Sequence, residues 1–166
     1  MPTPPNPDSV ARPLIHTQDP VLTGGCDCRW CQRETGTSFV LNAMIESDRV
    51  ELQAAAPVLV ETPSASGKGQ QVARCPKCHV AVRSHYGGAG RLLSFVRVGS
   101  LDEPDQLPPD LHIFTDTKQP WLALGNSVPV VDQYYEIDAH WPPESLARWQ
   151  VLLPLIKAQR DRRCGD

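Results

Sequence analysis

The chain has 166 residues, with sixteen basic and nineteen acidic side chains and a formal net charge of -3. Its length suits one domain, and its apolar share of 40% and charged share of 21% are typical of a globular protein. No apolar run in the sequence approaches the roughly 20 residues that a bilayer requires. These values argue against membrane insertion, and the lack of a basic excess argues against nucleic acid as a partner.

Residues 1–21 form a first region in which proline recurs. Prolines remove backbone donors and hinder regular strand pairing, so we expect an extended or disordered arm here. The opening residues, MPTPPNPDSVARP, have neither a basic start nor an apolar stretch. They do not read as a secretory signal, which predicts a cytoplasmic location.

Short apolar runs rich in β-branched residues follow from Phe39 onward, separated by turn-forming segments at 64–69, 87–90 and 102–110. Their lengths favour strands over helices. The sequence therefore predicts a mainly β fold, with short antiparallel strands in packed sheets. The predicted strands are FVLNAMI, VEL, PVLVET, QQVAR, HVAVRSHY, LLSFVRV and VPVVDQYY.

One helix is predicted near the end of the chain, in the segment WPPESLARWQVLLPLI. Pro142 and Pro143 suit its first turn. Pro154 has no backbone N–H, and we expect it to kink or end the helix. The apolar face is predicted to contain Leu146, Trp149, Val151 and Leu153.

Five of the six cysteines fall in two clusters, GGCDCRWC at 24–31 and CPKC at 75–78. Two thiolates two residues apart can wrap a tetrahedral zinc ion at zinc–sulfur distances of about 2.3 Å. Without an export signal, paired C-x-x-C motifs indicate metal more than disulfides, buried packing or a redox dithiol. The predicted Zn²⁺ ligands are Cys26, Cys28, Cys31, Cys75 and Cys78, whereas Cys164 in the polar tail is expected to be an exposed thiol without a role.

These motifs resemble the glutathione-dependent formaldehyde-activating family, which shares a domain with centromere protein V. The matching segments are CDCRWCQRETGTSF, RCPKCHVAVRSHY, VRVGSLDEP and LHIFTDTKQPWLAL, and together they cover residue 24 to about residue 140. The resemblance implies a β-rich fold of the β-tent type, in agreement with the predicted strands. The chain then divides into the arm at 1–21, a zinc domain of this family at 22–141, and a helix with a polar tail at 142–166.

The resemblance implies two zinc ions, a closed structural one held by an early C-x-C with the late C-x-x-C, and an open catalytic one held by the C-x-C-x-x-C segment. This sequence departs from that pattern because no cysteine precedes Cys26. On a residue-by-residue match, Cys26, Cys28 and Cys31 form the open catalytic site, and Cys75 with Cys78 lack two ligands. Alternatively, the two clusters converge on a single closed four-sulfur ion.

The function that the resemblance implies is that of a zinc-dependent carbon–sulfur lyase, which forms or cleaves S-hydroxymethylglutathione, a glutathione–aldehyde adduct. Arg29, Arg33 and Lys118 are candidates for binding the carboxylates of glutathione. The alternative is a zinc-stapled β domain that binds another protein without catalysis. The absence of the early C-x-C favours this alternative, and the intact C-x-C-x-x-C favours the enzyme.

Three further residues lie in or beside the motifs. His112 could hydrogen-bond near the site, although a single histidine on a strand is more often structural. His79 follows Cys78 directly, and adjacent strand residues point to opposite faces, which argues against its being a ligand. Trp121 is expected to be a core or lid residue.

Overall fold

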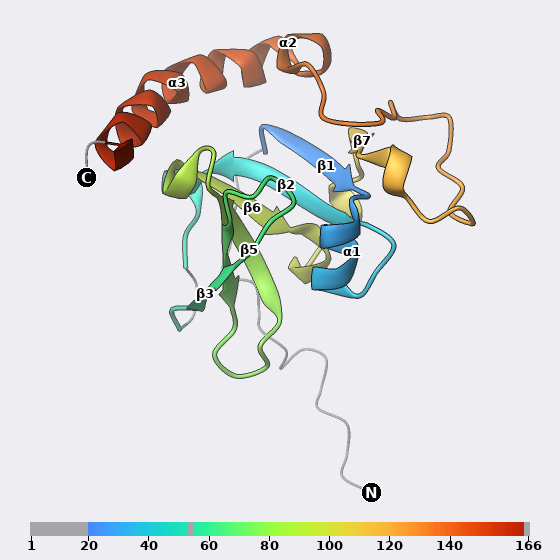
Figure 1. Ribbon diagram of the computed structural model, residues 1–166, viewed down its shortest axis with the longest axis horizontal. Coiled ribbons are helices and arrows are strands. Elements are labelled where there is room, and N and C mark those ends of the chain that lie inside the picture. The colour runs from blue at the N-terminus through green and yellow to red at the C-terminus, as the bar shows by residue number, and fades with distance from the viewer. Residues whose placement is uncertain (1–19, 53–54, 165–166) are drawn as a thin grey trace, which may run out of the picture.

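The computed structural model describes residues 20–52 and 55–164, so nearly all of the predicted arm lies outside the described residues. A seven-stranded mixed sheet forms most of the fold, in the order β3-β4-β5-β6-β2-β1-β7 (Figure 1). Its strands are β1 (Leu22–Cys26), β2 (Val40–Glu46), β3 (Val58–Thr62), β4 (Gln70–Arg74), β5 (Ala81–Tyr86), β6 (Leu93–Arg97) and β7 (Leu111–Ile113). The helices are α1 (Arg29–Thr35), α2 (Ile137–His140) and α3 (Pro143–Cys164).

The predicted mainly β fold is confirmed, and the strand pairing adds a detail that the sequence did not indicate. Every strand pair is antiparallel except β1 with β7, which is parallel. Strands β5 and β6 pair only through Arg83 with Val96 and Ser84 with Phe95. Figure 1 shows β5 and β3 turning away from the direction of β1 and β2, so the single sheet bends where this pairing is short.

Strand β2 lies near the centre of the sheet and is apolar on both faces. Met44 belongs to a core cluster with Leu22 and Leu93, while its neighbours Ala43 and Ile45 belong to a second cluster with Val96 and Val98 on the other face. This division follows from the two-residue period of a strand. Burial on both faces explains why FVLNAMI is apolar at every position except Asn42 rather than alternating between apolar and polar residues.

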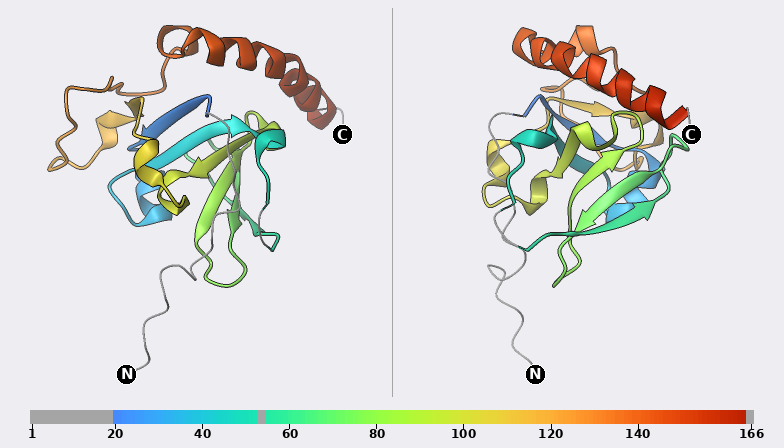
Figure 2. Two further views of the ribbon diagram at one scale, coloured as in Figure 1. Left: turned by 180° about the vertical axis from the view of Figure 1, so that it is seen from behind. Right: turned by 90° about the vertical axis from the view of Figure 1, so that its left-hand side faces the viewer.

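The C-terminal helix α3 covers the face of the sheet that carries Met44 (Figure 2). The predicted start at Pro143 is confirmed, but Pro154 lies inside the helix, which continues to Cys164. Leu152 and Ile156 are buried on either side of this proline, and their packing against the sheet opposes the break. Of the predicted apolar face, Val151 and Leu153 are exposed instead.

Several other elements differ from the sequence predictions. The segment VEL, which follows a short 3-10 turn at Ser47–Arg49, is not a strand. The segment VPVVDQYY contributes only an isolated bridge between Val130 and His112. Helices α1 and α2 were not predicted, and neither was β1, whose residues LTGGC lack a β-branched run. No helix in the described part of the chain is long and apolar enough to cross a bilayer.

Candidate metal centre

The first cysteine cluster lies where β1 passes into α1. Cys26 is the last residue of β1, Cys28 is the N-cap of α1, and Cys31 lies in the first turn of that helix. The Sγ atom of Cys28 accepts a hydrogen bond of 3.4 Å from the backbone N–H of Cys31, and the helix ends at Gly36, whose φ of 70° suits glycine. The strand-to-helix turn therefore directs all three side chains to one place.

The three sulfur atoms lie within 4.8 Å of one another, and no other described His, Cys, Asp or Glu joins this group. Two sulfurs bound to one tetrahedral zinc ion at about 2.3 Å are about 3.8 Å apart, so the spacing fits that ion. Three soft thiolate donors suit zinc and leave a fourth position for water or a substrate. Three protein ligands are the number typical of an open zinc site.

Hydrogen bonds among these sulfurs determine how they hold protons. Contacts from the Cys26 and Cys31 thiols lower the pKa of Cys28 to about 2, against the opposing effect of burial. The contacts to Cys28 and Cys31, together with burial, raise the pKa of Cys26 well above its usual value. For Cys31, the contact with Cys26 lowers the pKa, but the contact with Cys28 and burial outweigh it and raise the pKa to about 12. The three sulfurs thus compete for protons, and any divalent ion held by all three would require the remaining thiols to lose theirs.

The second cluster lies apart, in the turn between β4 and β5. Cys75 is buried and Cys78 is partly exposed, and neither joins the group of three sulfurs. The backbone N–H groups of Cys78 and Lys77 lower the pKa of the Cys75 thiol. The two clusters therefore do not converge on a single four-sulfur site.

A buried histidine and aspartate hold the first cluster against β7. His112 Nδ1 lies 2.9 Å from Asp27 Oδ2, and Asp27, between Cys26 and Cys28, is fully buried. Gly25 is paired with His112 across the β1–β7 ladder, and a Cβ atom at Gly25 would lie 2.6 Å from the His112 ring. The histidine can reach Asp27 only because residue 25 has no side chain.

Gln32 ties the same turn to the segment after β7. Its Nε2 donates hydrogen bonds of 2.6 Å to the carbonyl of Asp27 and 3.0 Å to the carbonyl of Thr117. Its Oε1 accepts one of 2.8 Å from Gln119 and one of 3.1 Å from Arg29. The amide of Gln32 is thus fully used, and it fixes α1 against residues 117–119.

An ion-pair network connects α1 with β4, which precedes the second cluster, and with β6. Glu34 accepts hydrogen bonds of 2.7 Å from Arg74 and 2.9 Å from Arg97, and Arg97 also donates to Asn42 at 2.5 Å. The side chains of Glu34 and Arg97 are only 5% and 8% exposed, so this carboxylate neutralises a buried guanidinium. Arg74 is the residue before Cys75, and Glu34 lies in the same helix as Cys31. The network therefore links the segments that carry the two cysteine clusters.

A small pocket of about 50 Å³ opens beside Cys26 on the face covered by aromatic residues. Tyr134 stacks on Tyr135 at a ring distance of 4.7 Å and lies near Phe114. This volume has room for a group of one or two heavy atoms. The pocket is lined by Leu22, Gly24, Cys26, Asn42, Met44, Phe95, Ile113, Tyr134 and Tyr135.

The other residues singled out from the sequence are placed around this centre. Arg29 and Arg33 are exposed on α1, and the ammonium group of Lys118 donates to the Leu122 carbonyl at 3.0 Å. Trp121 is 71% exposed, so of the two predicted roles, core or lid, the core role is wrong.

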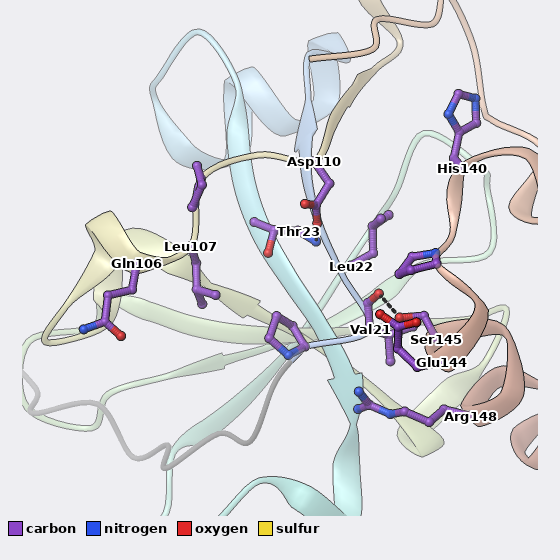
Figure 3. Close-up of a pocket in the computed structure, with 13 residues that line it drawn as sticks. Val21, Leu22, Thr23, Gln106, Leu107, Asp110, His140, Glu144, Ser145 and Arg148 are labelled. Carbon is purple, nitrogen blue, oxygen red and sulfur yellow. Dashed lines mark hydrogen bonds between the residues drawn. The ribbon is translucent and has the colours of Figure 1, made fainter. Parts of the chain in front are cut away.

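A larger pocket, of about 840 Å³, lies away from the cysteines at the start of β1 (Figure 3). It is bordered by charged side chains of both signs, among them Asp110, Glu144 and Arg148, and no cysteine lines it. The backbone N–H of Thr23 donates to Asp110 at 2.7 Å, and the hydroxyl of Ser145 donates to the Val21 carbonyl at 2.7 Å. These bonds fasten β1 to α3 and to the loop before β7.

Sequence reasoning missed Asp27, Gln32 and Glu34. Their positions in the sequence were only a weak sign of a role at the site: Asp27 lies inside the C-x-C motif, and Gln32 and Glu34 follow Cys31 within one turn of α1. Their partners lie forty or more residues away in the sequence, and only the folded sheet brings them within reach.

The model of the family described as glutathione-dependent formaldehyde-activating enzyme matches residues 13–117, more than half of the chain. The match contains both cysteine clusters, Asp27 and His112, and it ends before Lys118 and Trp121. No individually curated protein matches the chain.

Proposed function

Because the chain belongs to the glutathione-dependent formaldehyde-activating family, we propose that it is a zinc-dependent carbon–sulfur lyase that acts on a glutathione–aldehyde adduct. The proposed reaction forms or cleaves S-hydroxymethylglutathione. In the forming direction, the glutathione sulfur adds to the carbonyl carbon of formaldehyde, and the carbonyl oxygen takes up a proton. In the other direction, the same bond breaks and the proton is released.

The observation that carries this proposal is the gathering of the Cys26, Cys28 and Cys31 sulfurs within 4.8 Å, with no fourth protein ligand among the described residues. Zinc held by these three residues would supply a Lewis-acidic position at which an incoming thiol is kept as a thiolate. A purely structural ion is normally closed by four protein ligands. The three-sulfur set therefore favours the enzyme over a protein-binding module.

The surrounding residues have roles that follow from their positions. Asp27 and His112 keep the C-x-C turn in place through their buried contact. The pocket beside Cys26 is lined by Phe95 and Tyr134, among others, and has room for a one-carbon group. Its volume of about 50 Å³ favours formaldehyde over larger aldehydes, because a longer chain would not fit without moving the lining side chains.

Arg29, Arg33 and Lys118 remain the candidates for binding the two carboxylates of glutathione. Arg29 and Arg33 are exposed on α1, the helix that also carries Cys31. A guanidinium can bind a carboxylate with two parallel hydrogen bonds. Glutathione is the main soluble thiol of reducing compartments, so we place the reaction in the cytoplasm.

The experiment is exchange-resolved NMR on a mixture of ¹³C-formaldehyde and glutathione with purified, zinc-loaded protein. We expect the wild-type protein to raise the exchange rate between free and adduct carbon, and the Cys28→Ser variant to leave it at the uncatalysed rate. Cys164→Ser, the same change in the polar tail, serves as the control and should match the wild type. Equal rates with and without wild-type protein would refute the proposed activity.

A further inference from the structure

The turn that holds Cys75 and Cys78 is built like half of a metal site. The Cys75 sulfur accepts a hydrogen bond of 3.4 Å from the backbone N–H of Lys77. The backbone N–H of His79 donates to the Cys75 carbonyl at 3.0 Å, and that of Cys75 donates to Val80 at 2.9 Å. Backbone donors that point at a sulfur favour its thiolate form, which is the form that binds metal.

The backbone of this turn is held in a conformation that costs energy. His79 has a φ of 61°, the left-handed region that non-glycine residues rarely adopt. Such a residue persists only where its surroundings over-determine it, at a cost of about 1 kcal/mol or more. The turn is thus kept in one shape, with both cysteines on it.

The ligand set of this turn is incomplete within the described residues. Neither Cys75 nor Cys78 belongs to any group of three His, Cys, Asp or Glu side chains that could share an ion. Two thiolates are half of the four that close a structural zinc site. His79 itself does not complete the set, since its side chain is exposed and joins no such group.

The surface next to this turn is apolar and exposed. Val80, which follows the turn, is 39% exposed, and Val58, opposite Arg74 in the β3–β4 ladder, is 51% exposed. Val60 is exposed on the same face of β3 as Val58, Leu59 is exposed on the other face, and β3 is the outermost strand at this end of the sheet. An apolar edge strand of this kind is a surface on which another chain can pack.

We propose that a second copy of this chain completes the site, so that Cys75 and Cys78 of one protomer and the same pair of its partner hold one shared zinc ion. A twofold axis through the ion makes the arrangement self-complementary, because each copy contributes the same half. The apolar residues Val58 and Val80 are then covered at the interface. A site of four thiolates carries a net negative charge, which the exposed Lys77 of each copy offsets.

The test measures mass and metal content together on the full-length chain in a Cys164→Ser background, which removes the tail thiol. Light scattering during size-exclusion chromatography and native mass spectrometry should show a zinc-dependent dimer, with one shared ion in addition to the ion of each first cluster. Removing zinc with a chelator should return the dimer to monomers. The Cys26→Ser variant should lose the first-cluster ions and keep the dimer.

Two variants test the ligands and the interface separately. Cys75→Ser with Cys78→Ser should be monomeric and lack the shared ion. Val80→Asp leaves all cysteines in place and should weaken the dimer at least about tenfold, since it sets two carboxylates against each other across the axis. Val151→Asp, the same change at an exposed valine of α3, should leave the dimer intact.

A wild-type protein that stays monomeric when fully loaded with zinc would overturn the proposal. So would a monomer in which zinc protects Cys75 and Cys78 from alkylation, because the missing ligands would then come from the same chain. None of these measurements depends on turnover, so the shared ion and the proposed enzyme activity can fail separately.

Discussion

At the scale of single residues, the candidate metal centre depends on a missing side chain. Gly25 has no Cβ atom, and this lets the His112 ring lie where a methyl group would be 2.6 Å away. His112 in turn contacts Asp27, the residue between two of the three clustered cysteines. Of the two glycines before Cys26, only Gly25 is therefore required by packing, because a Cβ at Gly24 would meet nothing within 4 Å.

We expect Gly25→Ala to destabilise the fold by about 1–3 kcal/mol, the usual cost of overpacking, because the added methyl must displace His112. The displaced histidine should also loosen the C-x-C turn and speed zinc release. Urea unfolding and the rate of zinc transfer to a chromogenic chelator measure the two effects. Gly24→Ala is the matched control and should change neither by much, and equal behaviour of the two variants would contradict this role for Gly25.

At the scale of elements, helix α1 is too short to be stable alone, and its side chains anchor it. Glu34 binds Arg74 of β4 and Arg97 of β6, while Gln32 binds the segment after β7. Isolated helices of fewer than about 12 residues are marginal in water, so these contacts and the burial of Cys31 hold the helix in place. This explains why the sequence pattern around the cysteines did not predict a helix.

Glu34→Gln should cost about 3 kcal/mol of stability, because it leaves the buried guanidinium of Arg97 without its carboxylate. Chemical denaturation at neutral pH measures this loss. Glu61→Gln removes a carboxylate from the exposed strand β3 and should change stability by less than about 0.5 kcal/mol. A similar small effect for Glu34→Gln would show that the network contributes little.

At the scale of the whole molecule, apolar packing and the ion pair of Arg148 with Glu46 help to hold α3 on the sheet. Leu152 and Ile156 pack in the same core cluster as Met44 of β2. Arg148 donates to both carboxylate oxygens of Glu46, at the end of β2, one of these bonds being 2.7 Å long. Burial alone would raise the pKa of Glu46, but the Arg148 contacts outweigh it and lower the pKa below its usual 4.5.

A lowered pKa in the folded state stabilises the fold above the unfolded value, and this contribution is lost as the pH falls through the folded value. We therefore expect wild-type protein to exceed Arg148→Met in stability by about 2 kcal/mol at pH 7. The difference should shrink progressively below pH 4.5. Urea titrations of both proteins from pH 7 to pH 3 measure it, and a difference that does not change with pH would show that the ion pair is not its source.

Much of the fold was accessible from the sequence, because strand length and β-branched composition are local properties. The strands β2 to β6 were predicted within a few residues of their observed bounds. The parallel strand β7 and the bend at β5–β6 depend on contacts between distant segments, which composition does not encode. On α3, the predicted Leu146 and Trp149 do pack against the core, whereas Leu152 and Ile156 are buried in place of Val151 and Leu153, because the docking angle of a helix is set by the surface beneath it.

The sequence by itself determined the family and the residue types that can hold zinc, since the spacing of Cys26, Cys28 and Cys31 is short enough for the local backbone to bring them together. Only the tertiary structure decided that Cys75 and Cys78 stand apart from them, and that Asp27 meets His112 across eighty-five residues. The physical reason is the distance over which ligands must come together. A tetrahedral ion gathers ligands a few ångströms apart, and for distant segments that separation is set by strand order and sheet curvature rather than by spacing along the chain.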